Sequence, residues 1–150
     1  MNNAAHLHTV LSHFTISFPL IGLALLLAGM LFRSNLAQRF AYFLFIVVGV
    51  LTFFMMNSGE GAEEIVEELG RSHHQIHEHE EHAEKLAVLN YILATLGLLG
   101  IWISLKLKKY SIYLNVVSCI VALAVLCFTV EVAQEGGKIT HVEAYENIEE

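Results

Sequence analysis

The sequence contains few charged residues, a single proline and no aspartate. Only 15% of its 150 residues are charged and 55% are hydrophobic, whereas soluble domains usually carry about 25% charged residues. A chain this apolar is neither a disordered tail nor an array of linkers. Its length fits one domain, so the composition predicts a single apolar unit rather than a water-soluble globule.

Acidic residues are absent before Glu60, and all fifteen acids are glutamate. The eight basic residues are scattered, and the formal net charge is -7. The basic residues form no patch that could contact the phosphates of a nucleic acid, so we exclude nucleic acid as a partner. Cys119 and Cys127 lie eight residues apart, about 12 Å along a helix. This separation is too long for a disulfide, and we expect both to be packing residues.

Four long uncharged runs dominate the chain. They cover residues 14–32, 40–58, 86–105 and 110–130, and each is close to the roughly 20 residues that cross a bilayer as a helix. The sequence therefore predicts an all-α integral membrane four-helix bundle in one domain. We place the spans at about 12–33, 39–58, 86–106 and 110–131, joined by an outer helical loop at 59–85 and followed by an outer tail at 132–150.

The charges give the predicted bundle two different ends. Five of the eight basic residues lie in the two short turns between spans, at positions 33, 39, 106, 108 and 109. Loops rich in lysine and arginine stay in the cytoplasm, so both turns are expected there. Both termini and the long loop then lie on the outer side, together with all fifteen glutamates and all nine histidines.

The outer loop is expected to contain an additional amphipathic helix. Apolar residues recur there at i, i+3, i+4 and i+7, at Ala62, Ile65, Val66 and Leu69. This spacing favours a helix lying on the membrane or on the bundle. Gly70 would end it.

A second helix would start at Ser72, with Gln75 completing a capping box, and would continue into the third span. Helical spacing puts His79, His82 and Leu86 on one face of it. The other face would carry His74, His77, Glu78 and Glu81. The two sets therefore cannot all serve one site.

Imidazole and carboxylate groups are common ligands of iron, zinc and copper, so this outer rim is a candidate transition-metal site. The zinc-protease pattern H-E-x-x-H is absent, and without C-x-x-C-H covalent haem is excluded. Haem b stays open, with His13 on one side and His79 or His82 on the other as cofactor ligands. His13 stands out because ionisable groups at the start of an apolar span are usually functional.

A plainer interpretation is a solvated acidic cap that keeps the outer surface wet. We favour it for His73, His74 and His77, because runs of polar residues are usually exposed.

Four short motifs resemble a known family. The segment His8-Thr9-Val10-Leu11-Ser12-His13-Phe14-Thr15-Ile16 is similar to an H-P-x-x-V-H-F-P-I start, with threonine in place of both prolines. Gly61-Ala62-Glu63-Glu64 is similar to G-x-A-E, and Ile76-His77-Glu78-His79-Glu80 to I-E-x-H-E. Gly136-Gly137-Lys138-Ile139-Thr140-His141 is similar to a closing G-G-x-[LI]-x-x segment. In this order the chain resembles the small predicted bacterial membrane proteins of the DUF2231 type.

The resemblance implies four spans in the bacterial inner membrane and a context shared with haem and redox proteins, although the family has no settled activity. It also singles out the candidate metal ligands His8, His13, Glu63, His79, Glu80 and His141.

The sequence thus predicts a small polytopic membrane protein whose outward-facing His/Glu site binds a transition metal or haem, in envelope redox or metal handling. Whether it is an enzyme is left open. The expected partners are the lipid bilayer and a membrane redox or envelope complex. One alternative is a non-catalytic accessory subunit whose acidic, histidine-rich outer face binds a partner protein. Another is an acid sensor, because loop histidines gain charge below about pH 6.

Overall fold

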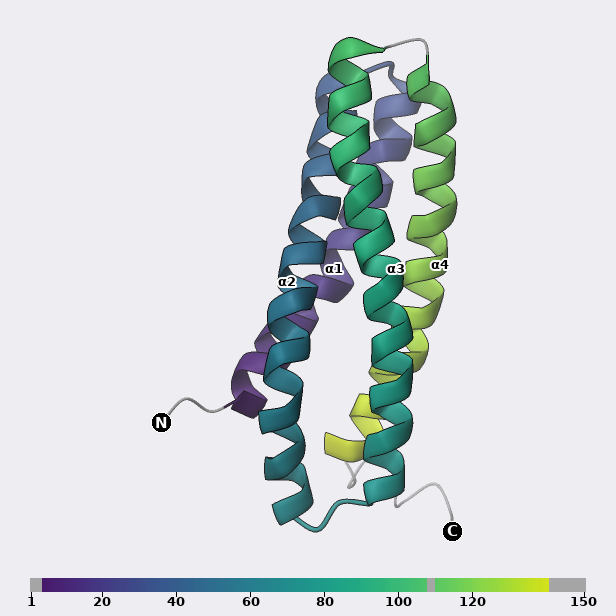
Figure 1. Cartoon of the computed structure of the whole chain (residues 1–150). Helices are drawn as coiled ribbons and strands as arrows, with labels where there is room; N and C mark the ends of the chain where they lie inside the picture. The colour runs from purple at the N-terminus through teal and green to yellow at the C-terminus, as the bar shows by residue number, and fades with distance from the viewer. Residues whose placement is uncertain (1–3, 108–109, 141–150) are drawn as a thin grey trace.

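The computed structural model describes residues 4–107 and 110–140. This part of the chain forms four α-helices: α1 (Ala4–Leu31), α2 (Asn35–Glu68), α3 (His73–Lys106) and α4 (Ser111–Thr140). The helices run alternately up and down (Figure 1), and each contacts its neighbours in a closed ring of α1, α2, α3 and α4. The described residues contain no strand. The predicted all-helical class is therefore confirmed.

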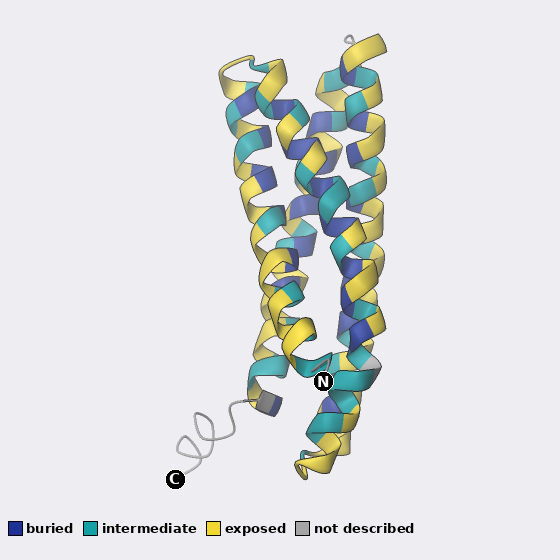
Figure 2. Cartoon of the chain, turned by 90° about the vertical axis from the view of Figure 1, so that its left-hand side faces the viewer, coloured by how far each residue is buried: buried dark blue, intermediate teal, exposed yellow. Residues whose placement is uncertain are grey.

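All four helices are long and apolar enough to cross a membrane, so the chain is a multi-pass membrane protein. Large apolar side chains cover the outer surface, while buried residues line the inner sides of the helices (Figure 2). The centre of the bundle is mainly apolar. It contains the fully buried Leu26, Phe45, Val48, Leu93 and Val125.

The two ends of the bundle differ, and we name them by their charge. At the basic end, α1 and α3 finish and α2 and α4 begin. At the acidic end, α2 turns into α3 through residues 69–72. In Figure 1 the basic end is at the top and the acidic end at the bottom.

Glycines let the helices approach closely, as their positions in the spans predict. A Cβ atom added to Gly22 would lie 2.5 Å from the Phe45 ring, and one added to Gly97 would lie 2.7 Å from the Tyr42 carbonyl oxygen. A Cβ atom at Gly100 would overlap the Tyr42 ring itself. These contacts fix α2 against α1 on one side and against α3 on the other.

Two hydrogen-bonded groups interrupt the apolar interior. Near the basic end the Tyr42 hydroxyl donates to Asn115 Oδ1 at 2.6 Å, and Asn115 Nδ2 donates to Gln38 Oε1 at 3.0 Å. Nearer the acidic end Asn90 Nδ2 donates to Thr52 Oγ1 at 3.1 Å. Both groups join different helices, as polar side chains commonly do inside membrane bundles.

The additional amphipathic helix is not confirmed, because α2 continues without a break through residues 59–68. This segment has no proline, and its glutamates and alanine are good helix formers, so the loss of apolar character does not end the helix. α2 ends at Glu68, two residues before Gly70, which has a φ of 77° and follows the helix end as the sequence predicts for this segment.

α2 and α3 are therefore longer than the hydrocarbon core of a bilayer. Each contains 34 residues, about 51 Å of helix at 1.5 Å per residue, against a hydrocarbon core of roughly 30 Å. α4 likewise continues to Thr140, so residues 132–140 are helical rather than a tail. Residues 4–13, 59–85 and 131–140 lie beyond the uncharged runs at the acidic end.

Candidate functional site

The first turns of α3 carry an exposed row of histidines. The side chains of His74 and His77 are 80% and 61% exposed, and each lies 3.5 Å from a glutamate one turn later, Glu78 and Glu81 respectively. His73 is also exposed. Such surface pairs contribute little to stability. The prediction that these histidines form a solvated cap is confirmed as far as their exposure is concerned.

The opposite face of the same turns points into the bundle. His79 and His82 are half-buried there, and Ile76, Ala83 and Leu86 are buried. The predicted separation of the two faces is therefore confirmed. It follows from the 3.6-residue turn of the helix, which brings positions 79, 82 and 86 to one side.

His82 bridges α3 to α4. Its Nδ1 atom lies 2.6 Å from Glu135 Oε1, and the two side chains are 36% and 23% exposed. With a proton on Nδ1, His82 donates to this carboxylate. The other carboxylate oxygen, Glu135 Oε2, is buried and has no hydrogen-bond partner among the described residues.

His79 lies against the backbone of α4. A Cβ atom added to Gly136 would be 3.1 Å from His79 Cε1, a tight contact that the ring could relieve only by shifting by a few tenths of an ångström. His79 Nδ1 is buried without a hydrogen-bond partner among the described residues. Burial lowers the pKa of His79 below its ordinary value of 6.5, the nearby His8 lowers it further, and Glu135 opposes both effects.

His8 reaches the same region from α1. Its Nδ1 atom lies 3.5 Å from the hydroxyl oxygen of Ser58 on α2. Burial lowers the pKa of His8, and a hydrogen bond with the Met55 backbone partly opposes this. We call His8, His79, His82 and Glu135 the inner cluster. Three imidazoles and one carboxylate from three helices thus lie in one region, and the lowered pKa values of His8 and His79 favour their neutral forms.

The other predicted ligands lie elsewhere. His13 is exposed on α1, where its carbonyl oxygen accepts a 2.7 Å hydrogen bond from Ser17. Glu63 is partly exposed on α2. Glu80 is on the exposed side of α3, 3.8 Å from His77. His141 lies outside the described residues. Of the predicted set, the structure brings together His8, His79 and His82.

Sequence reasoning misses Glu135 and Ser58. The expected fourth span ends at Glu131, which leaves Glu135 in an outer tail. The sequence feature that could have indicated Glu135 is its spacing of four residues from Glu131. If the helix continues for one more turn, residues 131 and 135 lie next to each other on the same side. Ser58 carries no signal, since it closes an apolar run and its role depends on packing against α1.

The donor atoms of the inner cluster do not converge on one point. Within residues 4–107 and 110–140, no group of three His, Cys or Glu side chains is arranged to hold a metal ion. Metal binding at the inner cluster would therefore require its side chains to turn.

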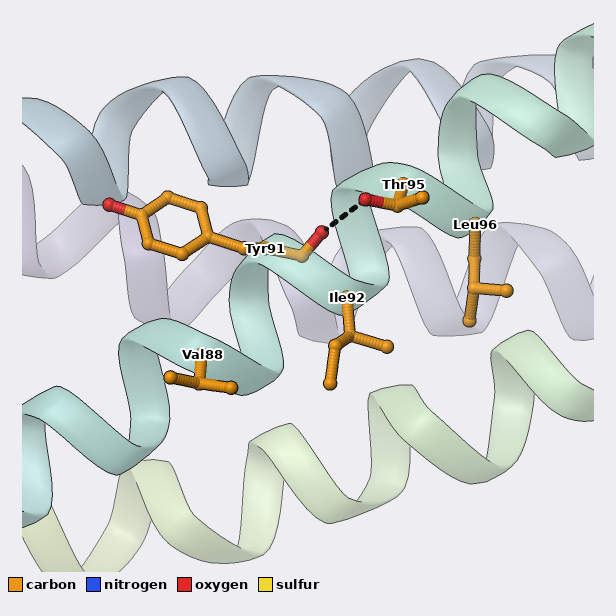
Figure 3. Close-up of a pocket in the computed structure, with 5 residues that line it drawn as sticks. All are labelled: Val88, Tyr91, Ile92, Thr95 and Leu96. Carbon is orange, nitrogen blue, oxygen red and sulfur yellow. Dashed lines mark hydrogen bonds between the residues drawn. The ribbon is translucent and has the colours of Figure 1, made fainter.

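One groove runs along the lipid-facing side of α3, lined by Val88, Tyr91, Ile92, Thr95 and Leu96. Figure 3 shows the Thr95 hydroxyl bonded back to the Tyr91 carbonyl oxygen at 2.8 Å, within its own helix. A second pocket lies at the basic end. Neither is lined by a member of the inner cluster.

No protein-family model, curated protein or solved structure matches this chain. The resemblance to the DUF2231 type therefore stays a prediction, and the site has to be interpreted from its own residues.

Proposed function

We propose that the chain is a small multi-pass protein of the bacterial inner membrane that binds a transition-metal ion through its inner cluster, in metal handling or redox chemistry at the envelope. One observation carries the proposal. His79 Nδ1 and Glu135 Oε2 are both buried in this cluster without hydrogen-bond partners among the described residues. Buried polar atoms normally have partners, and a bound cation would provide one for both.

The donor set suits iron, zinc or copper. Imidazole nitrogen and carboxylate oxygen are the usual ligands of these ions. A proton on His82 Nδ1, directed at Glu135, leaves Nε2 as a lone-pair donor, which is how ligating histidines are commonly oriented. His8 and His79 favour the neutral form that a metal requires. We favour a metal ion over haem because the cluster includes the buried carboxylate oxygen Glu135 Oε2, and carboxylate is a usual ligand of metal ions but not of haem iron.

Binding requires a change of side-chain rotamer. His8 is the candidate to move, because it lies near the start of α1 and its contact with Ser58 is a weak 3.5 Å. Its rotation would also break its hydrogen bond with the Met55 backbone. His79 is held by the backbone of α4 and Glu135 by its bond to His82, so these groups supply the fixed part of the site.

The charge of the two ends supports an orientation with the inner cluster outside. Arg33, Arg39 and Lys106 are at the basic end, which the positive-inside rule assigns to the cytoplasm. A variant without Cys119 and Cys127 allows a test with a membrane-impermeant thiol reagent on intact cells. Ser72→Cys should react and Lys106→Cys should not. The reverse pattern would invert the proposed orientation.

The metal proposal is tested with untagged protein purified in detergent, by elemental analysis and by titration of the metal-stripped protein with Zn²⁺, Cu²⁺ or Fe²⁺. His79→Gln and Glu135→Gln should lower affinity by about tenfold or more, the range seen when groups around a metal are lost. His74→Gln is the matched control, because it removes an exposed imidazole from the same helix. His13→Gln tests the ligand that the sequence favours, and we expect no effect.

Circular dichroism and gel filtration show whether each variant is folded. Equal affinity in wild type, His79→Gln and Glu135→Gln would contradict the proposal. If these variants keep their metal content but lose a co-purifying protein, the accessory-subunit alternative is the better one. A porphyrin Soret band lost in His79→Gln would instead indicate haem.

A further inference from the structure

A polar pocket of about 230 Å³ opens at the basic end, between the end of α1 and the starts of α2 and α4. This volume is smaller than the roughly 300–1,000 Å³ of sites for drug-sized ligands, so it suits a small chemical group. The pocket is lined by one cation, Arg33, and by the polar side chains of Asn35, Gln38, Ser111 and Asn115. Its chemistry is therefore different from that of the apolar groove on α3.

The pocket is electrically positive and has no neighbouring carboxylate. Arg33 carries a full charge, and neither α2 nor α4 has an acidic residue in its first turn. In the sequence, residues 1–59 and 86–130 contain no acid at all. Both helices begin at the pocket, so the positive ends of two helix dipoles add to the charge of Arg33. An anion would meet no acidic side chain here, and the two helix N-termini outnumber the one helix C-terminus, that of α1, at the pocket.

The base of the pocket is ordered and still has hydrogens to donate. Gln38 and Asn115 are only 8% and 3% exposed. Gln38 Nε2 donates to the Gly29 carbonyl oxygen at 3.0 Å, and Asn115 Nδ2 donates to Gln38 Oε1. Each amide nitrogen has two protons, and the two hydrogen bonds use one proton of each nitrogen. The second proton of each amide makes no hydrogen bond among the described residues, and both side chains line the pocket.

Arg33 has a φ of 54°, a left-handed conformation that non-glycine residues rarely adopt. The conformation follows from the three-residue turn between α1 and α2. It keeps the basic side chain beside the pocket and at the edge of the first apolar run.

We propose that this pocket binds the phosphate of an anionic phospholipid headgroup. Arg33 would form paired hydrogen bonds with two phosphate oxygens, and the amides and the helix N-termini would contact the others. The apolar side chains of Met30 and Ile112 also line the pocket and suit the start of an acyl chain. A zwitterionic headgroup is disfavoured, because its cationic group would find no carboxylate at this end. The proposal does not depend on the metal site.

The test is native mass spectrometry of the full chain in detergent, after equilibration with short-chain phosphatidylglycerol, short-chain phosphatidylcholine or inorganic phosphate. Wild type should retain one phosphatidylglycerol in preference to phosphatidylcholine. Arg33→Gln should lower this retention by about tenfold, in line with the loss of one charge-assisted paired contact, and Arg33→Lys should recover part of it. Lys106→Gln is the matched control, because it removes an exposed cation at the same end that does not line the pocket.

Asn35→Ala, at an exposed position, provides a second variant if Arg33→Gln does not fold. Equal losses in Arg33→Gln and Lys106→Gln would overturn the proposal, since they would indicate attraction by overall charge. Equal retention of both lipids would also overturn it. If millimolar inorganic phosphate displaces phosphatidylglycerol, the pocket recognises phosphate itself from either source. If it does not, the lipid is the ligand.

Discussion

Replacing Gly100 with alanine should destabilise the bundle, although alanine is the better helix former. The added methyl group would overlap the ring of Tyr42, which is only 1% exposed. Overpacking of this kind costs roughly 1–3 kcal/mol. Moving the ring also breaks the 2.6 Å bond to Asn115, and a buried acceptor left without a donor costs roughly 1–3 kcal/mol more.

The higher helix propensity of alanine offsets up to about 1 kcal/mol of this loss of stability. The free energy of unfolding should therefore fall by about 3 kcal/mol, from the sum of these effects. It can be measured by titrating the protein with SDS in mixed micelles, following helix content by circular dichroism and the fluorescence of Trp102, the only tryptophan.

Gly59→Ala is the matched control, because it lies in α2 and its added Cβ atom would have no neighbour within 4 Å. We expect it to be neutral or slightly stabilising. In a Tyr42→Ala background, Gly100→Ala should lose most of its effect, since the ring it overlaps is gone. If Gly100→Ala unfolds like wild type within about 0.5 kcal/mol, smaller than any of the costs above, the close packing of α2 on α3 is wrong.

Three further predictions concern the polar groups. Because burial lowers the pKa of His79 from 6.5, its contribution to stability is complete above pH 6.5 and is lost as the pH falls through the lowered value. Metal-free wild type should therefore lose more thermal stability between pH 7.5 and pH 5 than His79→Gln, and equal losses would contradict this. A double-mutant cycle of His82→Gln and Glu135→Gln at pH 7 should give a coupling of about 1 kcal/mol for their half-buried bond, and strict additivity would show that the bond is absent. Thr52→Val removes the acceptor of the Asn90 amide and should lower the free energy of unfolding by about 1 kcal/mol, and no change in an SDS titration would refute the contact.

The four spans are predictable from the sequence because an uncharged apolar run of about 20 residues, coiled as a helix, matches the thickness of the bilayer. It is also predictable that His79 and His82 lie on one face of their helix, because helical spacing alone determines which residues share a face. Neither inference needs knowledge of the partner helices.

The rest of the site depends on packing. Charged residues end a membrane span but do not end a helix, so α2 and α4 continue past the points where the uncharged runs stop. This is why the sequence does not reveal Glu135. His13 is favoured as a ligand by the free-energy cost of placing an ionisable group near the membrane. Whether its side chain faces the bundle depends on the rotation of α1 about its own axis, which this cost does not determine. His8 and His13 are five residues apart, about 140° around a helix, so only one of them can face the bundle.

The presence of proline in α1 alone has a mechanical consequence. The single proline, Pro19, lies in the middle of α1, where it removes a backbone hydrogen bond and allows bending. α2 and α3 have no such hinge and are continuous from the basic end to the tip of the acidic end. A force applied to that tip is therefore transmitted as a tilt of two stiff rods. Displacing the hairpin on one side of the bilayer would shift Gln38 and Ser104 near the other, while α1 can absorb the movement at Pro19.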